Sequence, residues 1–104
     1  TFSTDAHGKV MMYNAACLNL LDTNQSLKGR PIDELFQLTD DSSQKIHLFE
    51  LLSAATRTTR RSDVRHTYSD GEQIRLELTM APIKSSFGDQ RKGSPLQGYV
   101  VIAR

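Results

Sequence analysis

Residues 5–16 read DAHGKVMMYNAA, and residues 70–83 read DGEQIRLELTMAPI. The first stretch predicts a hairpin turn over residues 5–8, because Asp bonds to nearby backbone groups and Gly tolerates a positive φ. Asn14 follows at a position where its side chain can cap the first turn of a helix. The second stretch predicts an Asp-Gly hairpin turn that leads into a strand with alternating apolar and polar side chains. Antiparallel β-structure is therefore expected at both ends of the chain.

Apolar spacing and turn residues predict the other elements. The expected helices cover residues 15–21, 32–36 and 44–55, and the expected strands cover residues 1–4, 9–13, 63–68, 73–83 and 98–104. We interpret the polar residues 84–97 as a loop. The order ββαααβββ predicts an α+β fold, with a five-stranded antiparallel sheet and helices packed on one face. The last strand is almost wholly apolar, and we therefore expect it inside the sheet.

Length and charge bound the kind of protein. A chain of 104 residues has the size of one domain, so we expect residues 1–104 to form a single domain. Strand-like residues run to both ends, and we expect this domain to be a piece of a larger multidomain protein. The formal net charge of +1 gives no electrostatic case for nucleic acid. No apolar run reaches the roughly 20 residues that cross a bilayer, so we expect no direct membrane contact.

Cys17 is the only cysteine of the chain. One thiol can form neither an internal disulfide nor a zinc site of several cysteines, and this composition suits a reducing compartment. The sequence also shows no targeting signal. We therefore expect a cytoplasmic domain, whether or not its parent protein is anchored in a membrane.

The order of these elements and their turn residues resembles the PAS family over essentially the whole chain. The front of the family pattern, Asp-x-x-Gly-x-aliphatic followed by Asn-x-Ala, corresponds to Asp5, Gly8, Val10, Asn14 and Ala16. A Leu-x-Gly connector, an Asp-Gly turn, a Pro-Ile strand end and a final Gly-aliphatic-Arg strand correspond to residues 27–29, 70–71, 82–83 and 98–104.

This resemblance implies a sensory domain that does no chemistry of its own. It would detect a small ligand or signal and pass it through residues 99–104 to a covalently linked output domain, such as a histidine kinase or a cyclic-dinucleotide enzyme. The residues that we expect to line a ligand pocket are Met12, Asn14, Cys17, His47, Leu51, Leu78 and Met80. We expect the domain to form a homodimer, and the alternative function is a ligand-free dimerisation or protein-interaction module. It would pair through the outer face of the sheet, where we expect Arg75, Glu77 and Thr79, or through a segment before Thr1.

The residues argue against flavin and haem, and they leave the identity of any cofactor open. Light-sensing flavin relatives carry a reactive cysteine in the stretch Asn-Cys-Arg-Phe-Leu-Gln, whereas Cys17 stands in Ala-Ala-Cys-Leu-Asn-Leu. We interpret Cys17 as a small buried residue, which is the usual place of a free cysteine. Haem-binding relatives carry their axial histidine near the end of the long helix, whereas His47 stands near the beginning of residues 44–55.

A basic run of Arg57, Arg60, Arg61 and Arg65 follows the expected long helix. The simpler interpretation is a solvated helix end, where cations are favourable. The alternative is an anion site for a carboxylate ligand or an acidic partner, because Arg binds carboxylates with two hydrogen bonds.

His7 and His66 have no cysteine or carboxylate at metal-ligand spacing, so we predict no metal site and expect both side chains to face solvent. The chain contains no Gly-x-Ser-x-Gly elbow and no glycine-rich phosphate loop. We therefore expect this domain to have no enzymatic activity.

Overall fold

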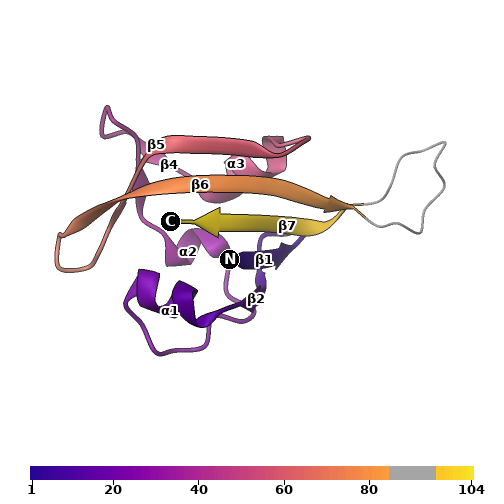
Figure 1. The fold of residues 1–104 in the computed structure, drawn as a ribbon, viewed down its shortest axis with the longest axis horizontal. Coiled ribbons are helices and arrows are strands. Elements are labelled where there is room, and N and C mark those ends of the chain that lie inside the picture. The colour runs from indigo at the N-terminus through magenta and orange to yellow at the C-terminus, as the bar shows by residue number, and fades with distance from the viewer. Residues whose placement is uncertain (85–95) are drawn as a thin grey trace.

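The computed structural model of the chain describes residues 1–84 and 96–104. Of the loop expected over residues 84–97, residues 85–95 lie outside the described part. Within the described residues the chain forms seven strands and three helices (Figure 1). In chain order they are β1 (Phe2–Asp5), β2 (Val10–Tyr13), α1 (Ala15–Leu21), α2 (Ile32–Leu35), β3 (Leu38–Thr39), β4 (Lys45–Ile46), α3 (Leu48–Ala54), β5 (Thr59–Thr67), β6 (Gln73–Lys84) and β7 (Leu96–Ala103).

The strands of the described residues form one antiparallel sheet in the order β2-β1-β7-β6-β5-β3-β4. The α+β class is as predicted, but the expected count of five strands is wrong. Two short strands of two residues each, β3 and β4, extend the sheet beyond β5. The last strand, β7, lies between β1 and β6, as its apolar sequence predicts.

The helix expected over residues 44–55 is wrong in its first half. Asp40 forms a turn there, because its Oδ1 accepts hydrogen bonds from the backbone N–H groups of Ser42 (2.8 Å) and Gln44 (2.9 Å). Such local bonds compete with helix formation, and β3 pairs with β4 on either side of the turn. The helix α3 begins only at Leu48, and its buried leucines keep the helical spacing that the sequence predicts.

The strand β5 begins at Thr59, earlier than we expected. Its first residues pair with the middle of β6, and this ladder holds them extended although their own sequence shows no clear alternation. The pairing shifts at a β-bulge between Arg61 and Val64. Arg60, Arg61 and Arg65 therefore lie on a strand and not at the end of a helix, which corrects the interpretation of this basic run.

The front of the chain folds as predicted. In the turn between β1 and β2, the Asp5 carboxylate accepts hydrogen bonds from the backbone N–H groups of His7 (2.9 Å) and Lys9 (3.0 Å). These bonds, that of Lys9 above all, lower the pKa of Asp5. Asn14 caps α1, with its Oδ1 accepting from the N–H of Cys17 at 3.2 Å.

The core lies between the three helices and one face of the sheet. In Figure 1, α2 and α3 lie behind the sheet. Along β6, the buried Leu76, Leu78 and Met80 alternate with residues that remain more exposed. We call the opposite side of the sheet the outer face; it carries Arg75 and Glu77. The buried core residues include Phe2, Val10, Cys17, Leu27, Ile32, Phe36, Leu38, Leu48, Leu52, Val64, Tyr99 and Val101.

Candidate ligand and interaction sites

The predicted pocket residues do not gather around one cavity. Cys17, Leu78 and Met80 are buried in the core, each 2 % exposed or less. Leu51 on α3 is half-buried and packs against the same core. Other side chains line the hollows at the surface. The side chains of these four residues fill the interior of the domain.

Three other predicted pocket residues lie at the surface. Met12 is 72 % exposed, and together with Asn14 it lines a shallow, mainly apolar hollow of about 270 Å³. His47 is exposed at the start of α3 and makes no capping hydrogen bond with its side chain. The predicted set therefore divides between the core and two separate places at the surface.

Cys17 holds the first helix against the start of β1. Its thiol donates to the backbone carbonyl of Thr1 at 3.0 Å, and it lies 3.1 Å from Oδ1 of Asn14. These contacts engage the thiol in local hydrogen bonds within the fold. They suit the interpretation of Cys17 as a small buried residue of structural value.

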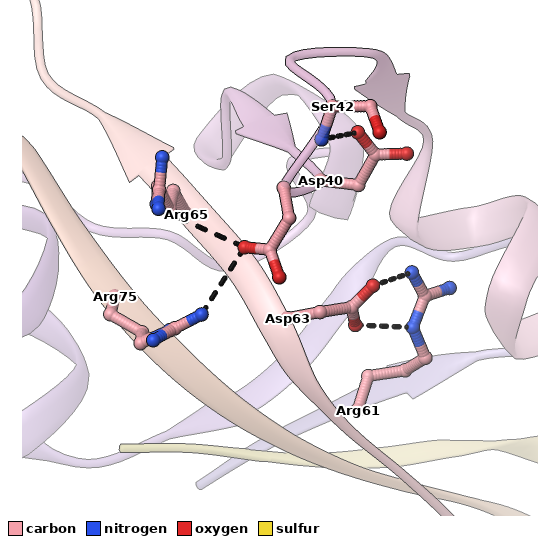
Figure 2. Close-up of polar contacts among 7 residues, drawn as sticks. Asp40, Ser42, Arg61, Asp63, Arg65 and Arg75 are labelled. Carbon is pink, nitrogen blue, oxygen red and sulfur yellow. Dashed lines mark hydrogen bonds and ion pairs between the residues drawn. The ribbon is translucent and has the colours of Figure 1, made fainter.

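The four predicted anion-site arginines do not converge on one point. Arg60 pairs with Glu77 on the outer face. Arg61 holds Asp63 through two N–H···O bonds of 2.8 Å (Figure 2). The hydrogen bonds from Arg61 lower the pKa of the Asp63 carboxyl. Arg57 is exposed in the connection between α3 and β5.

An unexpected charged cluster forms where β5 and β6 meet the turn between β3 and β4. Arg65 and Arg75 are direct partners in the β5–β6 ladder, a position in which like charges destabilise a sheet. The Asp41 carboxylate approaches both, 3.8 Å from Nη2 of Arg65 and 3.2 Å from Nη2 of Arg75. Figure 2 labels the two arginines and marks both contacts with dashed lines. The three side chains are 42 % exposed or more, so these pairs stabilise the turn only modestly.

The outer face is hollowed beside the end of β7. This hollow of about 340 Å³ is lined by Arg60, Glu77, Thr79, Ile102 and Arg104. Glu77 and Arg104 exchange both backbone N–H···O bonds, at 3.0 and 3.1 Å, so the ladder between β6 and β7 continues one residue beyond β7. The rim carries two arginines and one carboxylate, which suits a partner with acidic groups.

His66 is buried, which corrects the expectation that it faces solvent; it is 4 % exposed. Its Nδ1 accepts a hydrogen bond from the backbone N–H of Gln37 at 3.1 Å, and its ring packs edge-on against Phe36 and Tyr68. Burial lowers the pKa of His66 below the usual 6.5. The signal that the sequence held was its spacing of two from Val64, which places both side chains on the inner face.

Comparison with protein families identifies the class of protein. A family model described as a PAS domain matches residues 1–103 of the chain. The chain therefore belongs to the PAS family, whose members are sensory and signalling modules that generally carry no catalytic activity themselves. Searches of curated proteins and of solved structures found no match. Within the described residues, no helix is long and apolar enough to cross a membrane.

Proposed function

We propose that this PAS domain is a non-catalytic input module of a cytoplasmic signalling protein. It detects a small ligand or signal and transmits it through β7 to a covalently linked output domain, such as a histidine kinase or a cyclic-dinucleotide enzyme. The observation that carries this proposal is the position of β7, which pairs with β1 on one side and with β6 on the other. A change in the curvature of the sheet must therefore change the pairing of β7.

The close approach of β1 to β7 supports the same route. Gly98 pairs with Asp5, and a Cβ atom added at Gly98 would lie 1.9 Å from the backbone carbonyl oxygen of Thr4. Because no side chain separates the two backbones here, a displacement of β1 is passed directly to β7. The backbone hydrogen bonds between Glu77 and Arg104 then carry this displacement to the end of β7.

Native mass spectrometry of the purified chain, followed by hydrogen exchange, tests this proposal. We expect a co-purified small molecule, and we expect the amides of residues 99–104 to exchange more slowly in the ligand-bound form than after ligand removal. The amides of α3, which does not belong to the sheet, serve as the internal control. A bound molecule that leaves the exchange of residues 99–104 unchanged would contradict transmission through β7.

A second candidate function is a ligand-free homodimerisation or interaction module that uses the outer face. The observation that favours it is the uncovered apolar surface at this side: Met12 is 72 % exposed, while Val100 and Ile102 of β7 are only half-buried. Isolated exposed apolar residues are common, but neighbouring ones mark interaction surfaces.

Sedimentation of the purified chain and of a Met12→Glu variant tests the second candidate. A dimer through the outer face is expected to dissociate in the variant, because the substitution places a charge in the contact. Glu50→Gln, an exposed change on α3, is the matched control and should leave the dimer intact. A chain that sediments as a monomer at micromolar concentration would contradict this candidate.

A further inference from the structure

A separate hollow lies where α1, α2 and β5 end, apart from the outer face. It has a volume of about 290 Å³. In Figure 1, the turn between β5 and β6 lies at the left of the view, next to α1. The hollow is walled by Leu21 and Leu35 of the two helices, by His66 of β5, by Tyr68 just after that strand, and by Asp22 and Asp70.

His66 gives this hollow a directed hydrogen-bond donor. Its Nδ1 accepts the backbone N–H of Gln37, so the neutral ring carries its proton on Nε2. Nε2 makes no hydrogen bond within residues 1–84 and 96–104. In the same part of the chain, every side-chain nitrogen or oxygen that is closed off from solvent has a hydrogen-bond partner. Nε2 therefore opens onto the hollow, although the residue as a whole is only 4 % exposed.

The charge around this donor is negative. Asp22 and Asp70 line the hollow, and among its described lining residues there is no lysine or arginine. Asp22 is the C-cap residue of α1, and its side chain is exposed. Asp70 accepts the N–H of Glu72 with one carboxylate oxygen, which leaves the other for a ligand. Burial is the main cause that raises the pKa of Tyr68, and the neighbouring carboxylates of Asp22, Glu72 and Asp70 raise it further. Their negative field therefore reaches the wall of the hollow.

We propose that this hollow binds a small organic cation, namely a primary amine that also carries a hydroxyl or carbonyl oxygen. The oxygen of the ligand accepts the Nε2–H of His66, and its ammonium group pairs with the carboxylates of Asp22 and Asp70. A volume of about 290 Å³ admits about ten non-hydrogen atoms if each needs roughly the 30 Å³ of a water molecule. This hollow would be the site at which the proposed sensory domain detects its ligand. Binding itself does not depend on the proposed function; only its transmission through β7 does.

Titration of the ¹⁵N-labelled chain with ethanolamine, followed by NMR, tests the inference. EDTA in the buffer removes trace metal, and sodium acetate serves as an anion of similar size. We expect ethanolamine at millimolar concentration to shift the amides of residues 22 and 66–70, and acetate to leave them unchanged. Shifts that are absent, that are spread evenly over the chain, or that acetate also produces would overturn the inference.

Asp22→Asn identifies the carboxylate without disturbing the fold. Asp22 has a φ of 53°, a left-handed conformation that Asn adopts as readily as Asp. We expect this substitution to weaken ethanolamine binding by about threefold, as loss of one exposed ion pair does, and replacement of Asp22 and Asp70 together by Asn to weaken it by about tenfold. Glu50→Gln removes an equal charge on α3 and should have no effect. Equal affinities of Asp22→Asn and Glu50→Gln would exclude the site.

The two proposals fail in different experiments. Ethanolamine binding without any change in the exchange of residues 99–104 would retain the site and remove the signalling role. A co-purified molecule that slows exchange in residues 99–104, in a chain that does not bind ethanolamine, would retain the signalling role and remove this site.

Discussion

The two faces of the sheet use their side chains in opposite ways. On the inner face, Leu76, Leu78 and Met80 are almost completely buried, and burial of one such side chain contributes about 1.5–3 kcal/mol to folding. On the outer face, Arg60 and Glu77 form an ion pair whose side chains are 70 % and 43 % exposed. Exposed ion pairs contribute at most about 1 kcal/mol. Stability therefore resides in the inner face, and the outer face can vary to suit a partner.

The largest effect should follow truncation on the inner face. We expect Leu78→Ala to lower the free energy of unfolding by about 2–5 kcal/mol, because the change removes buried methyl groups and leaves a cavity. Urea denaturation measures it. Thr79→Ala, one residue along the same strand but on the outer face, should change stability by no more than about 0.5 kcal/mol. Equal losses in the two variants would break the distinction between the faces.

A somewhat smaller effect is expected at the contact between β1 and β7. The Cβ of Gly98→Ala would meet the carbonyl oxygen of Thr4, and relief of such an overlap costs about 1–3 kcal/mol. Hydrogen exchange of residues 2–5 should accelerate as β1 moves away. Gly71→Ala is the control: it has open space around the new Cβ but a φ of +91°, so it should lower stability without altering exchange in β1. Unchanged exchange of β1 in Gly98→Ala would contradict the close approach.

Acidification should destabilise the inner face through His66. In the folded protein, burial lowers the pKa of His66 below its usual value of 6.5. Between this lowered pKa and 6.5, the unfolded chain therefore binds more protons than the folded protein. The stability that neutral His66 contributes is present above pH 6.5 and is lost as the pH falls through 6.5 towards the lowered value. Urea denaturation over this range measures it.

His66→Asn is the control for this pH dependence, because its side-chain oxygen can accept the Gln37 N–H without titrating. We expect the variant to lose part of the dependence between neutral and mildly acidic pH. A variant whose stability follows the same pH profile as the parent chain would show that His66 is not the responsible group.

The smallest effect is expected on the outer face. Asp41→Asn should lower stability by less than about 1 kcal/mol, and added salt should reduce the loss, because Asp41 separates two exposed arginines. A double-mutant cycle sharpens the result. The cost of Asp41→Asn should shrink once Arg75 is replaced by Gln, since the repulsion with Arg65 has gone. Strictly additive losses would mean that Asp41 does not screen the arginine pair.

The sequence predicted those elements whose signals are local. Asp5, Asn14 and Asp70 each act on backbone groups within four residues, and the structure has the turn or cap that they predict. The strands β3 and β4 could not be predicted in this way. Each has two residues: β3 forms because the edge of β5 offers a partner, and β4 pairs in turn with β3.

The candidate sites depend on still longer-range contacts. His66 meets the backbone of Gln37 through a pairing that no local spacing encodes. Arg65 and Arg75 became neighbours through the register of two strands, with Asp41 supplied by a third segment. Residue types alone indicated arginine and histidine as candidates. Their partners, and the face on which each lies, required the fold.

The antiparallel pairing of β1 with β7 also has a mechanical consequence. Phe2 lies opposite Val101, so the beginning of β1 and the end of β7 meet at the same end of the strand pair (Figure 1). Tension applied between these two points acts across the strands, and it loads the interstrand hydrogen bonds one after another instead of all together. Under such a pull the pair opens one rung at a time from Phe2, and because the Phe2 side chain is buried in the core, the first step also draws on the core packing.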